Sequence, residues 1–212
     1  MYLVELCCTG NNARSRMAES IGNRLALDEG LEQKIKFISS GILAVPPKIR
    51  SYEWVAGVLE HASKIDIIGK QELDQGRYEK DENYQIELLG AANEARYRMM
   101  VIEERLAASA LRELGLEIPS GRRQTIVRDD VSLMLGMERK HVAYAKRIYR
   151  KHKKTTGKSR HPMMMTLNRF TGIEGEIPEL LGTIDINPYR ELREELFKIM
   201  DHVIERLKSG IS

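Results

Sequence analysis

The chain has 212 residues and is 42% hydrophobic, which is enough for a substantial apolar core in one α/β domain or one domain with an insertion. Its only two cysteines are adjacent, which excludes a disulfide framework and is typical of a reducing, cytoplasmic setting. No apolar run approaches the roughly 20 residues that span a bilayer. No secretory signal is visible, so we expect a cytoplasmic protein without a membrane partner.

The net charge of +3 conceals an uneven distribution. Residues 138–160 contain ten Lys or Arg and one acidic residue, a local net charge of +9 that leaves −6 for the rest of the chain. The charge therefore points to one basic segment rather than to a basic protein.

A short polar stretch near the start organises the chain: residues 8–15, Cys-Thr-Gly-Asn-Asn-Ala-Arg-Ser. The apolar run at 2–7 before it predicts a buried parallel strand. After it, an apolar helical face recurs at Met17, Ile21 and Leu25. Ser15 is placed to cap that helix. The predicted order is strand, polar loop, helix.

A loop that closes on a helix N-terminus points several backbone N–H groups at one spot, which suits an anion. Cys8 lies at the mouth of this loop, where the helix N-terminus and Arg14 favour the thiolate form. A thiolate beside a phosphate-binding loop suits nucleophilic phosphoryl transfer. The alternative is that Cys8 is a small buried hydrophobe and Arg14 a surface charge.

The stretch from Cys8 to Ser15 resembles the phosphate-binding loop of the low-molecular-weight protein tyrosine phosphatases, whose signature is Cys, five residues, Arg and Ser. The resemblance implies that Cys8 attacks phosphorus to give a phosphocysteine, which water then hydrolyses, and that no metal or other cofactor is needed. It implies that Asn11 braces the loop and that Ser15 hydrogen-bonds the thiolate. Arg16 replaces the family's usual proline and adds a cation beside the phosphate. The residues implied in phosphate binding are Thr9, Gly10, Asn11, Asn12, Ala13, Arg14 and Ser15.

Strand and helix patterns alternate along the rest of the chain. Further strands are predicted at 36–41, 96–103 and 163–167, helices at 51–61, 106–114, 138–153 and 191–207, and an extended loop at Pro46-Pro47. The end of the second strand, Ser39-Ser40-Gly41, is similar to the family's Ser-Ala-Gly. We therefore expect an α/β fold similar to phosphatase I: an open, doubly wound parallel sheet of about four strands, with the ligand at their carboxyl ends.

We interpret residues 1–212 as one low-molecular-weight phosphatase-like domain with a basic helical insertion at about 117–161, because members of the family run to roughly 150 residues. The helix at 138–153 has a narrow apolar stripe. Its basic face is either solvated or binds an acidic or phosphorylated partner. Aromatic residues in it are limited to Tyr144 and Tyr149, so we do not predict a nucleic-acid-binding module.

The family's mechanism needs a general acid, normally an Asp followed by Pro and an aromatic residue. Here Pro188 and Tyr189 follow Asn187, and an amide cannot donate that proton. We expect Asp185 to act as the acid, with Glu179 as the alternative. Loss of general acid catalysis costs about 10²–10⁴ in rate. A catalytically weakened protein that binds phosphate groups is therefore the competing interpretation.

The resemblance implies that the substrate is a phosphomonoester, either protein phosphotyrosine or a small molecule. Asn12 stands where tyrosine-specific members commonly carry an apolar residue and members that act on phosphoarginine carry Thr, and Thr9 also resembles the latter. Phosphoarginine is therefore the alternative substrate. The candidates for lining the substrate slot are Trp54, Asn187 and Tyr189, although core packing explains Trp54 equally well.

Overall fold

A computed structural model describes residues 1–42, 51–121, 123, 125, 127–157, 161–175 and 177–211. The predicted loop at Pro46-Pro47 and residues 158–160 of the basic segment lie outside the described residues. The strands are β1 (Tyr2–Cys8), β2 (Ile35–Gly41), β3 (Val131–Gly136) and β4 (Met163–Thr166). The helices are α1 (Arg14–Asp28), α2 (Tyr52–Lys64), α3 (Gln75–Tyr78), α4 (Glu82–Arg112), α5 (Arg139–Thr156), α6 (Leu167–Thr171) and α7 (Asn187–Ile211).

The four strands form one parallel sheet in the order β2-β1-β3-β4. Parallel neighbours need long crossovers, and α1 connects β1 to β2 while α5 connects β3 to β4. The predicted open parallel sheet is confirmed. At its carboxyl edge Cys8, the last residue of β1, pairs with Gly41, the last residue of β2.

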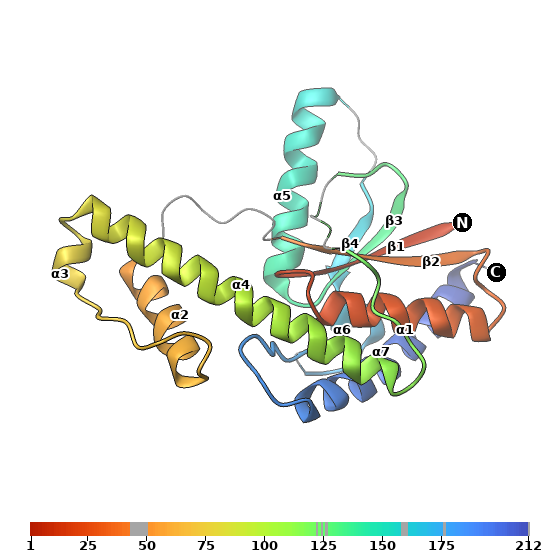
Figure 1. Ribbon diagram of the computed structural model, residues 1–212. Helices are drawn as coiled ribbons and strands as arrows, with labels where there is room; N and C mark the ends of the chain where they lie inside the picture. The colour runs from red at the N-terminus through yellow and green to blue at the C-terminus, as the bar shows by residue number, and fades with distance from the viewer. Residues whose placement is uncertain are drawn as a thin grey trace.

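Helices cover both faces of the sheet (Figure 1). On one face α1 packs against α7, and the side chains of Val4 and Leu6 on β1 belong to the core that the sheet forms with these two helices. On the other face α5 packs on β3 and β4, where Tyr149 contacts Met134. β1 is therefore buried on both sides, which explains why its sequence is apolar apart from Glu5.

The third strand was predicted in the wrong place. Residues 96–103 lie inside α4, a helix of 31 residues that also absorbs the helix predicted at 106–114. The apolar run at 99–102 suggested a strand, but short apolar runs do not separate strand from helix. Along the helix buried positions recur every three or four residues, at Tyr84, Leu88, Ala92, Ala95, Met99, Glu103, Ala107 and Ala110; Ala108 and Leu111 widen the buried face near its end.

The interpretation of 117–161 as an insertion also needs correction, because this range holds β3 and α5, which build the sheet and cover it. A different part of the chain, α2, α3 and the first half of α4, projects from the sheet (Figure 1). We call this unit the α2–α4 lobe, residues 52–99. It has its own apolar cluster, which includes Leu59, Tyr78 and Leu88. None of the described helices is long and apolar enough to cross a membrane.

Candidate active site

The loop between β1 and α1 is wound around the sulfur of Cys8. The backbone N–H of Asn11 points at Cys8 Sγ from 3.2 Å, and Ser15 Oγ donates to the same sulfur at 3.0 Å. Asn11 adopts a left-handed φ of 53°, and its Oδ1 lies 2.8 Å from Ser15 Oγ. Ser15 does not cap α1 as predicted, because the helix begins one residue earlier, at Arg14. The Ser15 hydroxyl faces the sulfur instead.

Gly41 allows β2 to approach the loop closely. A Cβ at this position would lie 2.8 Å from the backbone N of Asn11 and 2.9 Å from the carbonyl carbon of Gly10, which real Cβ atoms essentially never do. The Ile42 N–H donates to the Cys8 carbonyl at 3.1 Å and ties the strand end to the loop. The glycine of the Ser39-Ser40-Gly41 motif thus fixes the rear wall of the loop.

Arg14, the first residue of α1, is buried beside Cys8 and held by two carboxylates. Its Nη1 donates to Glu138 Oε1 at 2.7 Å, and its Nη2 lies 3.3 Å from Glu179 Oε1. Burial lowers the pKa of Arg14, but the charges of Cys8, Glu138 and Glu179 outweigh it and raise the pKa overall. Lys140 contacts both carboxylates, at 2.8 Å from Glu138 and 3.6 Å from Glu179. The Arg14 guanidinium is therefore held in place at the pocket before any ligand binds, and it remains charged.

A neutral histidine supports the start of the loop. Burial lowers the pKa of His141 to about 4, and the nearby charges of Arg14 and Lys140 lower it as well. Its Nδ1 accepts from the Glu138 backbone N–H at 2.9 Å, so the proton sits on Nε2. Nε2 then donates to Thr9 Oγ1 at 3.0 Å. The α5 N-terminus thereby positions both Thr9 and, through Glu138, Arg14.

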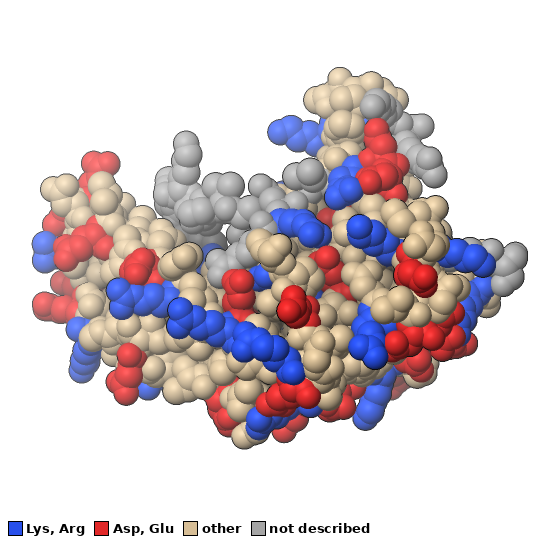
Figure 2. Space-filling view, turned by 45° about the vertical axis from the view of Figure 1, so that its right-hand side comes forward, with Lys and Arg blue, Asp and Glu red and all other residues tan. Residues whose placement is uncertain are grey.

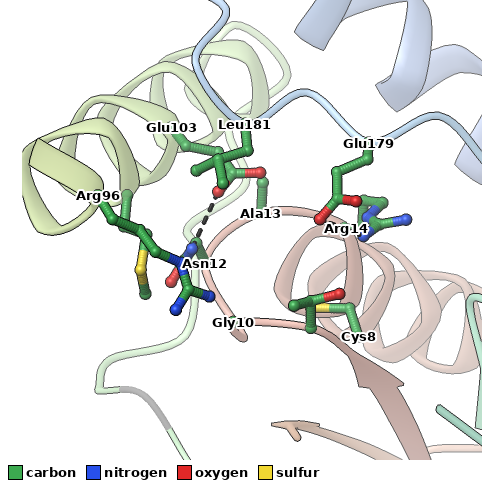
Figure 3. A pocket seen from close by; sticks show the side chains of 11 residues that line it. Cys8, Gly10, Asn12, Ala13, Arg14, Arg96, Glu103, Glu179 and Leu181 are labelled. Carbon is green, nitrogen blue, oxygen red and sulfur yellow. Dashed lines mark hydrogen bonds and ion pairs between the residues drawn. The ribbon is translucent and has the colours of Figure 1, made fainter. Parts of the chain in front are cut away.

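Helix α4 forms the opposite wall of the pocket. Glu103, itself buried, accepts from Asn12 Nδ2 at 2.9 Å. Arg96 and Met100 precede Glu103 by seven and three residues, so all three lie on one helical face, and all three line the pocket. Figure 3 shows Arg96 and Glu103 on this wall. The pocket is narrow, about 10 Å³, and is lined by Cys8, Thr9, Gly10, Asn12, Ala13, Arg14, Arg96, Met100, Glu103, Glu179 and Leu181.

Arg16 does not add a cation to the pocket as predicted. Its side chain is buried away from the loop, where Nη1 pairs with Glu104 of α4 at 2.8 Å and Nη2 donates to the Pro119 carbonyl. It fastens α1 to α4 instead. Among the described residues, no three His, Cys, Asp or Glu side chains come together as metal ligands.

Comparisons with known proteins agree with this geometry. Residues 3–80 match the family model described as low molecular weight phosphotyrosine protein phosphatase. The resemblance seen in the sequence is confirmed. The matched family consists of phosphatases, enzymes that hydrolyse phosphoric monoesters. No curated protein sequence matches the chain significantly.

Solved phosphatase structures share the fold over nearly the whole chain. A protein tyrosine phosphatase from Entamoeba histolytica has a TM-score of 0.59 at 14% identity, covering all of both chains. The YwlE arginine phosphatase from Geobacillus stearothermophilus has a TM-score of 0.55 at 19% identity, covering 99% of this chain and 95% of its own. A low-molecular-weight protein tyrosine phosphatase from T. tengcongensis has a TM-score of 0.54 at 19% identity, covering 97% and 99%. At these identities the likeness concerns the fold alone.

The structure separates the two acids that the phosphatase resemblance suggested. Asp185 does not line the pocket; it is exposed at the start of α7, where it accepts from the Asn187 backbone N–H at 3.1 Å. Glu179, the alternative, faces the pocket above Arg14 and Cys8 (Figure 3). The path of the chain before α7 therefore brings Glu179, and not the carboxylate nearer to Pro188, to the pocket.

The side chains predicted to line a substrate slot lie elsewhere in this phosphatase fold. Trp54 packs on the apolar cluster of the α2–α4 lobe. Tyr189 is fully buried, and its hydroxyl donates to the Leu180 and Thr183 carbonyls at 3.2 and 3.4 Å. Asn187 accepts from Arg190 at 2.9 Å on the surface. None of these three residues lines the pocket.

Four contributors to the site were missed in the sequence. For Glu138 and His141 a signal existed: they follow directly on the apolar residues 133–137 at the carboxyl end of β3, where parallel sheets place the residues of their sites. Arg96 and Glu103 carried no comparable signal, because their approach to the loop depends on how α4 crosses α1.

Proposed function

We propose that the protein is a cysteine-dependent phosphatase with Cys8 as nucleophile and Glu179 as general acid. The observation that carries the proposal is the sulfur of Cys8, which receives two hydrogen-bond donors and faces the guanidinium-bearing pocket. Donors aimed at a sulfur stabilise a thiolate more than a thiol. The buried apolar alternative for Cys8 does not account for these donors.

In the proposed reaction Cys8 Sγ attacks phosphorus in line. The S–P bond forms as the bond from phosphorus to the leaving oxygen breaks, and Glu179 gives that oxygen a proton. Water then attacks the phosphocysteine and the Glu179 carboxylate takes a proton from the water. The S–P bond breaks as the new O–P bond forms, so inorganic phosphate leaves and the Cys8 thiolate is restored. Arg14 and the backbone N–H groups of residues 9–14 hold the phosphate oxygens.

Phosphate binding in this pocket requires an exchange of anions on Arg14. The narrow pocket has Glu179 at 3.3 Å from the guanidinium, so an entering phosphate displaces that carboxylate toward the leaving group. Glu138, at 2.7 Å, stays and orients the guanidinium. Its pKa is lowered overall: burial raises it, but hydrogen bonds from Lys140 and Arg14 outweigh burial, so Glu138 is ionised at neutral pH.

The nucleophile and the acid are tested separately. Cys8→Ser should abolish hydrolysis of p-nitrophenyl phosphate, and retained activity would contradict the proposal. Glu179→Gln should slow phosphotyrosine hydrolysis by about 10²–10⁴ and spare p-nitrophenyl phosphate, whose leaving group needs no proton. Asp185→Asn is the matched control in the same loop and should change neither rate by more than about twofold. A loss confined to Asp185→Asn would reverse the assignment, and slow turnover insensitive to both would favour a phosphate-binding protein.

The substrate is proposed to be protein phosphotyrosine, with phosphoarginine as a second candidate favoured by the pocket's acidic walls. Glu103 and Glu179 stand on either side of the loop, and Asn12 makes its floor polar (Figure 3). No aromatic side chain among the described residues lines the pocket. Carboxylates suit a guanidinium better than a phenol ring. A relative by fold, the Geobacillus protein, is an arginine phosphatase by its title.

Glu103→Gln distinguishes the two substrates. A charge-assisted hydrogen bond is worth about 1.5–3 kcal/mol, so the variant should lose about 10- to 100-fold in kcat/KM on a phosphoarginine peptide if Glu103 contacts the guanidinium. Phosphotyrosine hydrolysis should then be affected far less. Equal losses on both peptides would mean that Glu103 acts only by holding Asn12, and would leave phosphotyrosine as the substrate.

We also propose that the chain is a single domain. Helix α4 runs from the α2–α4 lobe to the sheet, where it packs on α1 and α7, and Leu181 beside the pocket packs on the lobe's apolar cluster. One helix thus belongs to both cores, which favours cooperative folding.

A further inference from the structure

A broad groove runs along the carboxyl edge of the sheet next to the candidate active site. It lies between the N-terminal half of α5, the end of β4, α6 and residues 172–175, and its volume is about 1020 Å³. Four of its lining residues are cationic: Arg139, Lys140, Lys146 and Arg169. Partly buried apolar side chains, among them Met164, Met165 and Ile173, form its floor.

Three of these cations have no partner among the described residues. Arg139, Lys146 and Arg169 are exposed, and no ion pair or side-chain hydrogen bond to another described residue ties them down. Elsewhere arginines are commonly paired locally, as Arg24 is with Asp28 and Arg98 with Glu94. Figure 2 likewise shows acidic and basic side chains side by side over much of one face, including the upper projection. The groove therefore keeps positive charge available for an anionic ligand.

The groove adjoins the pocket that holds Cys8, because two ion pairs join residues that line the one to residues that line the other. Glu138 lines the groove and binds Arg14, and Lys140 lines the groove and contacts Glu179. A polypeptide whose phosphorylated residue enters the pocket can therefore continue into the groove without leaving the protein surface. We infer that this groove, which we call the α5–β4 groove, binds an acidic, extended segment of the phosphoprotein substrate that flanks the phosphorylated residue.

The chemistry of the groove favours a polypeptide over a nucleic acid. Single-stranded nucleic acids are commonly held by aromatic side chains that stack on bases, and no aromatic residue is among the described residues lining the groove. Glu138 and Glu174 also line it, so the groove accepts negative charge only beside its cations, which suits separate acidic side chains better than an evenly charged phosphodiester chain. Acidic side chains can reach the rim cations while apolar side chains contact the methionine floor.

The inference rests on the proposed phosphatase function, so the test includes a binding arm that needs no catalysis. A fluorescein-labelled, unphosphorylated peptide rich in Asp and Glu is titrated with the full chain, and anisotropy is recorded at low and physiological salt. The groove variant is Arg139→Gln/Lys146→Gln/Arg169→Gln. Lys140 is left intact because it contacts Glu138 and Glu179. The matched control, Arg150→Gln/Lys151→Gln/Lys153→Gln, removes three cations of α5 that do not line the groove.

We expect the groove variant to weaken peptide binding about tenfold at low salt and less at physiological salt, because exposed pairs are individually weak and screened. The control variant should bind within about twofold of the wild type. On phosphotyrosine peptides the groove variant should lose kcat/KM only where the flanks are acidic, while turnover of p-nitrophenyl phosphate stays unchanged.

Three results would overturn the inference: no binding of the acidic peptide, equal losses in both triple variants, or displacement of the peptide by a single-stranded oligonucleotide at lower concentration than by unlabelled peptide. Equal losses would mean a diffuse field around α5, and displacement by the oligonucleotide would mean a nucleic-acid surface. Groove-dependent binding without any hydrolysis of p-nitrophenyl phosphate would contradict the phosphatase proposal and leave the acidic-segment site standing.

Discussion

Glu5 offers a direct test of the electrostatics behind the active-site loop. It lies in the central strand β1, three residues before Cys8, and only 2% of it is exposed. Its Oε2 has no hydrogen-bond partner in the part of the chain that the structure describes. Burial raises the pKa of this carboxyl from its ordinary 4.5 to about 7, against the opposing effects of Ser40 and Arg128. The folded protein therefore prefers Glu5 protonated, and we predict that Glu5→Gln stabilises the protein at alkaline pH.

The magnitude follows from the two pKa values. Each pKa unit corresponds to about 1.4 kcal/mol, so a change from 4.5 to about 7 corresponds to about 3 kcal/mol. Between these values the folded state binds more protons than the unfolded state, so the free energy of unfolding falls as the pH rises through this window. Well above pH 7 the ionised carboxyl lowers the free energy of unfolding by the full amount, and well below pH 4.5 the protonated carboxyl does not lower it. Glutamine lacks the titration.

Urea unfolding followed by circular dichroism at pH 5 and pH 8 checks this prediction. The wild type should lose up to about 3 kcal/mol between the two values through Glu5, whereas Glu5→Gln should lose correspondingly less. The exposed Glu32 provides a matched control, and Glu32→Gln should follow the wild type. If Glu5→Gln and the wild type show the same change in stability from pH 5 to pH 8, the assignment of a buried, neutral carboxyl to β1 is refuted.

Two further predictions concern the loop itself. Ser15→Ala removes the 3.0 Å donor to Cys8 Sγ. Because a hydrogen bond to a charged group is worth about 1.5–3 kcal/mol, alkylation of Cys8 by iodoacetamide at neutral pH should slow about tenfold or more. An unchanged rate would show that the hydroxyl does not stabilise the thiolate. Gly41→Ala should abolish phosphatase activity in a folded protein, because its Cβ would meet the Asn11 backbone at 2.8 Å. In contrast, Gly90→Ala in α4 meets nothing within 4 Å and should preserve activity and add about 0.5–1 kcal/mol to the free energy of unfolding. Full activity in Gly41→Ala would contradict the tight approach of β2 to the loop.

The local sequence of the chain determined the fold class and the centre of the site. Residues 2–25 predicted strand, loop and helix in the right places, because a buried strand and a helix beginning at a polar loop depend on neighbours in sequence. Asn11 tolerates the left-handed backbone that the loop needs, and Gly41 leaves room for it. The strand at β2 and the basic helix α5 were predicted from local signals as well: a short apolar run that ends at Gly41, and an apolar stripe at helical spacing.

Tertiary structure decided what surrounds that centre. An apolar run of four residues within 96–103 fits a strand or a buried helix equally, and only packing against α1, α7 and the α2–α4 lobe makes it part of α4. The choice between Asp185 and Glu179 depends on the course of a loop whose Leu181 packs on that lobe. Glu103 reaches Asn12 across 91 residues of sequence. Contacts of this range carry no periodic signal in the chain, because they depend on the relative placement of whole elements rather than on the preferences of any one of them.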